Sequence, residues 1–556
     1  MSRKQQETLT VGDVVIPPEE QTPLVVQLVH VILEQQREIE KLRDEVSRQK
    51  GLPETPKRPI AKGNAQPSSL NERQMPSRAA KRKKKKSSKR KRRVGQRSGF
   101  AKRAKTSELE IHDHVPLRLD GLPEGTRPLG FVDYCVQDLL FQPHNTRYRR
   151  ARYQLPDGSL LTAPLPEHVN GHFGPTLRSY VIYQHHQNMV TQPLLLEELC
   201  EVGVQISAGT INRLLTENHD AFHQEKDSLL PAAREVSQYF HTDDTSARHQ
   251  GQSGHTLHIG NEWFASFFTT GSKSRVNFLE ILRQPFDDYV LSGDALFYLE
   301  YHGATQKLQR QMARVVKAAG GCLEIEGPQT WQRRLSRWRL KPEARRLVTE
   351  AALFGSLMEH DLYVHQPLIS DDARQFKVLG MMLGLCWLHA ERHVARLIPL
   401  NAREQKAYDK TRDAIWKYYQ RLKGYKESPT PRKKARLGRD FDRVFLRKTG
   451  YPELNAALAK IHAKRENLLL VLEHPEIPLH NNPSENDIRQ YVKKRKISAG
   501  TRSDLGRRCR DTFLSLKTTC RKLGVTFWRY LQDRIHGMNR VPSLGQLIRE
   551  RATVTH

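Results

Sequence analysis

The amino-acid sequence predicts an α/β protein whose largest domain is preceded by several smaller parts. Strand-like segments are grouped between residues 236 and 270, where the sequence contains VSQYFHTDD, HTLHIG and WFASFFTT, and long helical patterns follow them. The first hundred residues instead contain a heptad repeat and a run of Lys and Arg. With 556 residues, the chain is long enough for three or four domains.

Charge is the strongest signal in the composition. The chain has 92 Lys and Arg against 61 Asp and Glu, a formal net charge of +31, which predicts a polyanionic partner. No apolar run is long enough to span a bilayer, and the first residues lack the apolar stretch of a signal peptide. The six cysteines are scattered without a CxxC pair, which argues against a disulfide framework and favours a reducing cytoplasm.

Residues 1–50 are predicted to contain a coiled coil. Within 24–50, Val25, Ile32, Ile39 and Val46 lie seven apart, and Leu28 and Leu42 fall three later in their heptads, with the polar Gln35 between them. β-Branched residues at a with Leu at d favour a parallel dimer, so self-association through this region is expected. The alternative is one amphipathic helix packed on its own domain.

Residues 51–107 are predicted to be a disordered basic linker. They include KRKKKKSSKRKRR at 81–93 and almost no large apolar residue, so that self-repulsion keeps them extended. One interpretation is a segment that only keeps the protein soluble. The functional interpretation is a nonspecific DNA tether, with Lys83, Lys84, Lys85 and Arg90 among its contacts.

Two small parts are predicted next. Residues 108–166 have turn signals and a strand-like FVDYCVQDLLF at 131–141, which predicts a small β module. Residues 167–230 are helical and contain a helix-turn-helix candidate, with helices at 194–201 and 208–215 and Ser207 as the second N-cap. Asn212 and Arg213 on the second helix are side chains that can read base edges. An ordinary helical hairpin is the alternative.

Residues 231–540 are predicted to form the main domain, with 541–556 as a tail. Its first three strands form a meander, and the helical stretch 277–360 is an insertion. The short strand PLIS at 367–370 then leads into two more acids, and a helix is predicted over LGLCWLHAERHVARL. The charged helical stretch 401–470 is expected to be broken by a loop at PTPRKKARLGR.

Three acids sit where this pattern would bring them together. Phosphoryl transfer on DNA uses two divalent ions, and hard ions such as Mg²⁺ or Mn²⁺ bind carboxylate oxygens. Asp243 is at the end of the first predicted strand, Asp371 follows PLIS, and Glu485 lies near the start of a later helix. Among 61 acids many such triples arise by chance. Asp244 and Asp372 are neighbouring alternatives, although side chains on a strand alternate, and Asp294 is a rival for the second position.

These segments resemble the transposases of the insertion sequence 66 family. The shared features are Thr242-Asp243-Asp244-Thr245, then Cys386-Trp387-Leu388-His389 after SDDARQF, and Asn481-Asn482 followed by Glu485 and Arg489. The resemblance implies an RNase H-like core with an Asp-Asp-Glu triad at Asp243, Asp371 and Glu485. The family's Cys-rich zinc module is not matched, so no zinc is expected. The resemblance covers most of residues 24–536.

The resemblance also implies partners. They are double-stranded DNA at the element ends and the target, with accessory proteins of the same element as candidates, in the cytoplasm of a bacterium and associated with its nucleoid. Two alternatives stay open, a non-catalytic DNA-binding regulator and an RNase H-like nuclease without strand transfer. The residues expected to support the acids or to contact DNA near them are His389, Arg392, Arg489, Lys494, Arg495 and Lys496.

Overall fold

The computed structural model describes residues 9–11, 14–16, 110–117, 127, 131–166, 171–362 and 365–555. The chain divides into two compact units, Met1–Arg82 and Lys83–His556. In the first unit, β1 (Leu9–Val11) pairs antiparallel with β2 (Val14–Ile16). The predicted coiled coil at 24–50 and the basic linker at 51–107 lie outside the described residues, so both stay predictions. No described helix is long and apolar enough to cross a membrane.

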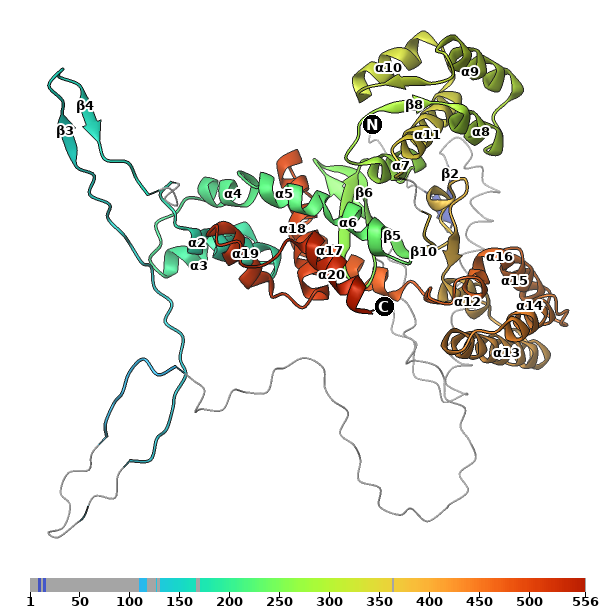
Figure 1. Ribbon diagram of the computed structural model, residues 1–556. Helices are drawn as coiled ribbons and strands as arrows, with labels where there is room; N and C mark the ends of the chain where they lie inside the picture. The colour runs from blue at the N-terminus through green and yellow to red at the C-terminus, as the bar shows by residue number, and fades with distance from the viewer. Residues whose placement is uncertain are drawn as a thin grey trace, which may run out of the picture. The chain divides into compact units, whose positions relative to one another are not determined.

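A five-stranded mixed sheet lies at the centre of the second unit (Figure 1). The predicted meander is present, because β5, β6 and β7 pair antiparallel in sequence order. β10 pairs in parallel with β5, and β11 pairs in parallel with β10, so the order is β11-β10-β5-β6-β7. The strands are β5 (Phe240–His249), β6 (Gln252–Gly260), β7 (Ala265–Thr270), β10 (Leu368–Ser370) and β11 (Leu383–Leu385).

Two strand predictions need correction. β5 does not end at its acids but continues to His249, because Gln250 and Gly251, with φ of 50° and 76°, make a tight turn that keeps it paired with β6. The start of the predicted helix LGLCWLHAERHVARL is the strand β11, since a short apolar run does not distinguish a buried strand from a helix. A Cβ on Gly384 would lie 2.6 Å from the Ile369 Cδ1, so glycine leaves room for the Ile369 side chain of the neighbouring strand.

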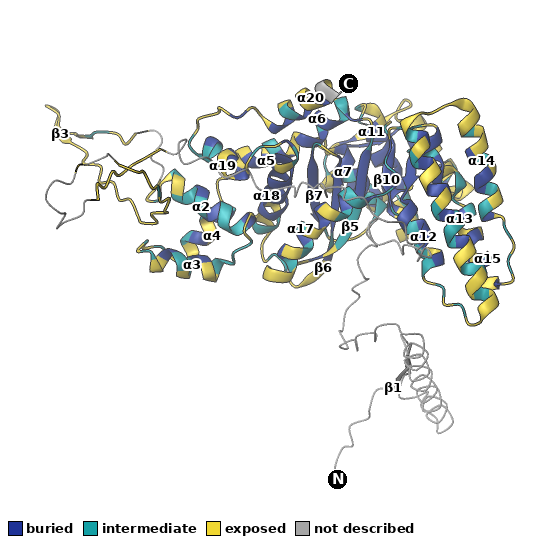
Figure 2. Ribbon diagram, turned by 90° about the horizontal axis from the view of Figure 1, so that it is seen from below, coloured by how far each residue is buried: buried dark blue, intermediate teal, exposed yellow. Residues whose placement is uncertain are grey.

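The two faces of the sheet have separate cores. On one face Ala247 and Phe267 pack with Ile488 and Tyr491 of α17. The other face belongs to the main core, in which Phe240 and Ile259 are buried with residues of α6 and α7. Figure 2 shows β7 and β10 of the sheet in the dark blue of buried residues. The helices concerned are α6 (Leu229–Val236), α7 (Arg275–Arg283), α17 (Asn482–Ser498) and α18 (Asp504–Lys522).

The edge strand β7 is covered by α18. The backbone N–H groups of Ala265, Phe267 and Thr269 donate to Thr519 Oγ1 at 3.2 Å, Ser515 Oγ at 2.9 Å and Asp511 Oδ2 at 2.7 Å. Four helical residues rise about 6 Å and two strand residues about 6.6 Å, so the two spacings match. The helix therefore satisfies donors that an open sheet edge would expose.

The predicted insertion forms a mainly helical unit between β7 and β10. Its one departure from an all-helical segment is a short antiparallel pair, β8 with β9. Trp331 is fully buried and stacks on Tyr289 with ring centroids 4.7 Å apart, and both belong to the main core that also contains Phe240 of the sheet. After α7, the elements are β8 (Tyr289–Leu291), α8 (Gly293–Tyr301), α9 (Gln306–Ala318), β9 (Leu323–Ile325), α10 (Pro328–Arg337) and α11 (Pro342–Glu359).

A second helical group separates α12 from α17. The predicted loop PTPRKKARLGR is wrong, because Thr430 caps a helix whose first residue is Pro431, and only Ser428–Thr430 break the chain. Phe441 and Phe445 are buried on this helix, which explains why the charged sequence is ordered. The group follows α12 (Trp387–Ala395) and consists of α13 (Ala402–Glu427), α14 (Pro431–Phe445), α15 (Pro452–His462), α16 (Arg465–Leu468) and a 3₁₀ turn at Leu470–Leu472. Another 3₁₀ turn, Arg374–Phe376, lies between β10 and β11.

The segment before the sheet differs in part from its prediction. Residues 131–141 form no strand, and 131–166 contribute only one exposed hairpin, because few of their apolar side chains find a partner. The helix-turn-helix candidate contains two helices, one of which begins two residues before the predicted 194–201 and the other of which ends one residue after the predicted 208–215. Ser207 caps the second by accepting from the Thr210 N–H at 3.2 Å. The elements are β3 (Arg152–Gln154), β4 (Leu160–Thr162), α2 (Pro175–His186), α3 (Gln192–Glu201), α4 (Ala208–Thr216) and α5 (Asp220–Asp227).

The predicted tail is helical. After α19 (Phe527–Ile535), α20 (Leu544–Thr555) buries Leu544 and Ile548 against the body, and Arg549 pairs with Glu235 of α6 at 2.6 Å. The spacing of these buried residues is that of a helix face, so the segment belongs to the core of the second unit.

Candidate active site

The sheet register brings Asp243 and Asp371 side by side. β10 pairs with β5 so that Leu368 lies opposite Phe240, a difference of 128 residues, and Asp371 and Asp243 differ by the same 128. Asp371 therefore follows its strand at the level of Asp243. In the antiparallel pair, Asp243 lies opposite His258, and both belong to the sheet face that α17 covers.

The neighbouring acids have other partners. Asp244 pairs with Lys273 at 2.9 Å and accepts a hydrogen bond from Gln375, on the sheet face opposite to Asp243. Asp372 pairs with Lys377 at 2.8 Å and with Lys464 at 2.7 Å. The rival Asp294 lies in the first turn of α8, inside the insertion. These contacts favour Asp243 and Asp371, although the choice of ligands itself stays a prediction.

Glu485 is held near these aspartates by the residue that starts its helix. Asn481 is completely buried, its Nδ2 donates to the Thr242 carbonyl oxygen at 2.8 Å, and its Oδ1 lies 2.7 Å from the His241 Nδ1. Its N–H donates to the Cys386 Sγ at 3.3 Å. Asn481 and Cys386 thus connect the starts of α17 and α12 to β5 at Thr242, the residue before Asp243.

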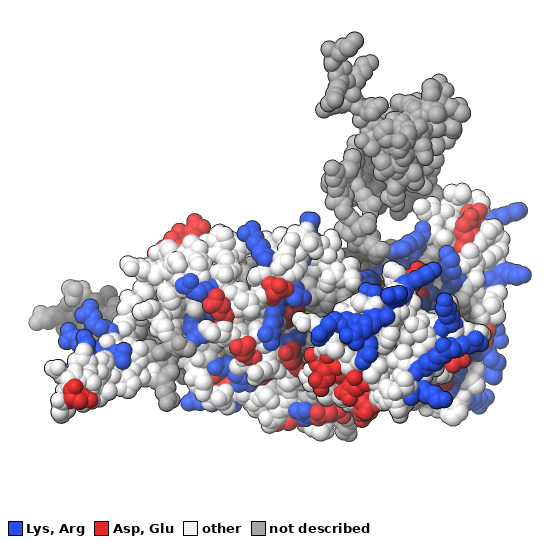
Figure 3. Space-filling model, turned by 90° about the horizontal axis from the view of Figure 1, so that it is seen from above, with Lys and Arg blue, Asp and Glu red and all other residues white. Residues whose placement is uncertain are grey.

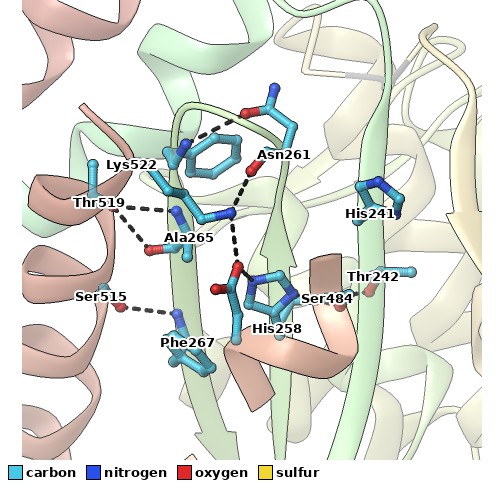
Figure 4. A network of polar contacts seen from close by, with 12 residues as sticks. His241, Thr242, His258, Asn261, Ala265, Phe267, Ser484, Ser515, Thr519 and Lys522 are labelled. Atoms are coloured by element: carbon cyan, nitrogen blue, oxygen red, sulfur yellow. Dashed lines mark hydrogen bonds and ion pairs between the residues drawn. The ribbon is translucent and has the colours of Figure 1, made fainter. Parts of the chain in front are cut away.

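A buried polar network fixes the next turn of α17 (Figure 4). His258 Nδ1 lies 2.7 Å from Ser484 Oγ, and His258 Nε2 lies 3.4 Å from Asp487 Oδ2. Asp487 also pairs with Lys522 at 2.7 Å, and Lys522 donates to the Asn261 carbonyl oxygen. Because Ser484 and Asp487 flank Glu485, this network sets the rotation of the helix that carries it.

His389 and Arg392, both on α12, lie beside Glu485. The His389 Nε2 and an Arg392 nitrogen are each 3.9 Å from Glu485 Oε1. This oxygen is buried and has no hydrogen-bond partner among the described residues. A buried carboxylate oxygen without a donor is the kind of group that a bound cation or substrate hydroxyl would satisfy.

The electrostatics of the site also favour a positive ligand. Burial raises the pKa of Asp243 to about 8, and the negative charges of Asp371, Asp244 and Glu485 act in the same direction. Burial also raises the pKa of Asp371, which the ammonium of Lys273 counteracts. Across the described part of the chain, no three His, Cys, Asp or Glu side chains are arranged to hold a metal ion. The donor chemistry fits Mg²⁺, whose charge would offset the repulsion among these carboxylates.

The residues predicted to contact DNA fall into several groups. On α4, Asn212 and Arg213 are exposed, while Ile211 and Leu215 are buried. Arg489 and Lys496 are exposed on α17, and Arg495 is bound to Ser246 of β5. The basic residues Lys83, Lys84, Lys85 and Arg90 lie outside the described part of the chain.

The structure contradicts the prediction for Lys494. It is only 5% exposed, and its ammonium donates to the His185 carbonyl oxygen at 2.7 Å, so it is not placed to meet DNA. Lys517 donates to the His186 carbonyl oxygen at the same distance. The two buried lysines thus satisfy the last carbonyls of α2 and attach it to α17 and α18.

We expect this attachment to depend on pH. Burial lowers the pKa of Lys494 to about 7, with the charges of Arg510 and Lys517 adding to the effect, from a usual value of 10.5. Below about pH 7 the folded state must hold a buried charge, and this penalty disappears as pH rises toward 10.5. The free energy of unfolding of the parent, relative to Lys494→Met, should therefore rise with pH between 7 and 10, by at most about 1.4 kcal/mol per pH unit. Calorimetry of both proteins at several pH values checks this, and parallel profiles would contradict it.

Sequence reasoning did not assign roles to His258, Asn481, Asp487 or Lys522. Asn481 belongs to the motif that also contains Asn482, Glu485 and Arg489, and this was the only indication in the sequence that it has a role. The other three make contacts between β6, α17 and α18 that no local pattern reveals. Lys273, which neutralises Asp244, was missed for the same reason.

The clustered carboxylates are typical of enzymes that use metal ions to act on nucleic acids, and comparison with known proteins agrees with this class. Residues 345–508 match the family described as "Transposase IS66 family", a stretch that includes Asp371 and Glu485 but not Asp243. The chain belongs to this family. It is 40% identical over 315 residues to the "Uncharacterized protein y4jO" of Sinorhizobium fredii (strain NBRC 101917 / NGR234), an alignment that covers 55% of this chain and 94% of that protein.

Proposed function

We propose that this protein is a DNA transposase that cleaves the ends of a mobile element and joins them to target DNA. Membership of the transposase family supports a DNA-processing enzyme. The observation that carries the catalytic part is the register that sets Asp371 beside Asp243, with Glu485 fixed nearby by Asn481. We further propose that the catalytic domain is RNase H-like, since a three-strand meander whose first strand pairs in parallel with a later strand is what that fold requires.

Asp243, Asp371 and Glu485 would hold the two Mg²⁺ or Mn²⁺ ions, which activate the attacking oxygen and stabilise the leaving oxygen. Around them, Asn481 and His258 orient the helix of Glu485. His389 and Arg392 are close enough to Glu485 to orient it or to contact a phosphate. Lys273 keeps Asp244 away from the metal-binding role by neutralising it.

The direct test uses the purified full-length chain, duplex DNA carrying the ends of the element, and Mg²⁺. Cleaved ends and products joined to a second duplex are expected. Cleavage without joining would favour the nuclease alternative. Specific binding without cleavage, in Mg²⁺ and in Mn²⁺, would favour the regulator and refute the proposal.

We propose that α3 and α4 recognise the element ends. Asn212 accepts a hydrogen bond from Gln192 at 3.3 Å, and Arg213 donates to Thr210 at 3.1 Å, both at the surface. The double change Asn212→Ala and Arg213→Ala should remove about 1–3 kcal/mol of discrimination for each lost base contact, while leaving binding to random DNA unchanged. Competition gel shifts measure this, and an unchanged preference for the ends would move recognition elsewhere.

Pairing of two element ends through residues 24–50 remains a proposal, as do the tethering role of residues 81–93, a nucleoid-associated location and accessory proteins of the element. Each follows from the sequence pattern or from the family. The hairpin of β3 and β4 carries no assigned role.

A further inference from the structure

The insertion between β7 and β10 carries a strongly basic surface that the catalytic proposal does not use. Residues 306–346 contain eleven Lys and Arg against three Glu, a net charge of +8. Figure 3 shows Lys and Arg gathered toward the right-hand side of the face seen there, where α9 and α10 lie. We define the α9–α10 surface by its exposed basic residues, which are Lys307, Arg310, Arg314, Lys317, Arg333, Arg337, Arg339 and Lys341.

The sequence of α9 places its charges on one face. Leu308, Met312 and Val316 are buried at intervals of four residues. The basic residues at 307, 310, 314 and 317 follow the opposite stripe at helical spacing. Ten residues of helix extend about 15 Å, a length over which one DNA strand presents about four phosphates. Four cations in a row therefore match the spacing of a phosphate backbone.

These charges are available to a partner. Across the described residues, none of the eight side chains of the α9–α10 surface forms an ion pair within the chain. The helices of the second helical group are basic too, but there Asp440 pairs with Arg421 and with Arg443, and Asp442 pairs with Arg465. The α9–α10 surface has no such internal neutralisation, which leaves its charges for an external anion.

The α9–α10 surface is also attached to the rest of the second unit by polar contacts. Gln311 of α9 donates to the Trp338 carbonyl oxygen at 3.4 Å, which joins α9 to the end of α10. Arg275 of α7 pairs with Glu350 of α11 at 3.1 Å, and α7 packs on the central sheet. These contacts attach the α9–α10 surface to the same unit that carries Asp243 and Asp371.

We propose that the α9–α10 surface binds the phosphate backbone of duplex DNA without reading its sequence, and so holds DNA that continues beyond the catalytic carboxylates. Five of its eight residues are Arg, whose planar group forms two parallel hydrogen bonds with a phosphate. The inference rests on the proposed function for the identity of the partner, and its test does not require cleavage.

The test variant changes Arg310, Arg314 and Lys317 to Gln in the full-length protein. Affinity for a random-sequence duplex is measured by fluorescence anisotropy with a chelator present, between 50 and 200 mM salt. We expect the log–log salt slope to become shallower by up to about 2.7, or about 0.9 for each lost phosphate contact. Affinity at the lower salt concentrations should fall about tenfold or more, and equally for element-end DNA.

The matched control changes Arg403, Lys406 and Lys410, three exposed cations on one face of α13, to Gln. It removes the same charge, so we expect a much smaller change in slope. An equal loss in both variants would show that only total charge matters, and an unchanged test variant would leave the surface to an acidic protein partner. A loss confined to element-end DNA would mean sequence reading. Each of these outcomes overturns the proposal, whereas a failure of the transposase proposal would appear in the cleavage assay and not here.

Discussion

A protein carrying Asp243→Asn should bind element-end DNA as tightly as the parent and cut it at least about a thousandfold more slowly. The substitution keeps the size of the side chain and removes the charge that the metal ions need. Metal coordination contributes several kcal/mol to the transition state, and about 4 kcal/mol corresponds to this factor. Asp371→Asn and Glu485→Gln should behave in the same way. Single-turnover cleavage with parallel gel shifts measures both quantities.

The doubled acids supply matched controls for this experiment. Asp244→Asn and Asp372→Asn remove the same charge one residue away, but their carboxylates are already paired with lysines. We expect them to keep cleavage within about tenfold of the parent, a barrier change of about 1.4 kcal/mol. If Asp244→Asn abolished cleavage and Asp243→Asn did not, the metal ligand would be Asp244.

Replacing Asp487 by Ala should destabilise the protein by about 3–5 kcal/mol. The Asp487 side chain is 5% exposed, and it pairs with Lys522, which is 13% exposed, and with His258. Removing the acid leaves a buried ammonium and a buried imidazole without their partner, which costs far more than the net value of the pair. Chemical unfolding followed by circular dichroism measures the loss.

The comparison for Asp487→Ala is an exposed ion pair in the same chain. Glu235 and Arg549 are each about half exposed, so Glu235→Ala should cost no more than about 1 kcal/mol. A similarly small loss for Asp487→Ala would show that the network of Figure 4 relaxes easily. The rotation of the helix that carries Glu485 would then need another explanation.

Much of the central sheet could be predicted because its strands have local signals. The three meander segments alternate or are apolar, and turn residues separate them, so their order and direction followed from the sequence. β11 was missed because three apolar residues before a long helical pattern carry no period of their own. The strand predicted at 131–141 was wrong because alternation predicts a strand only where another strand can pair with it.

The candidate site was predictable only through motifs. Asp371 and Glu485 were placed by their resemblance to family segments, and their geometry depends on pairing between residues more than a hundred positions apart. Lys494 shows that charge alone does not predict which basic residues contact DNA. A basic run on a helix predicts DNA contact, but one helix face is always turned inward, and Lys494 is on that face.

The way α18 covers β7 has a consequence for synthesis of the chain. Asn261 precedes Lys522, to which it is hydrogen-bonded, by 261 residues, and Ala265 precedes Thr519 by 254. At roughly 5–20 residues per second, the ribosome needs about 13–50 s to produce the partner helix after the meander has been made. During that interval the backbone of β7 is an uncovered edge on which a second nascent chain can add a strand. Nascent chains on the same mRNA are therefore most at risk of aberrant strand pairing at β7, before any of them has a complete catalytic site.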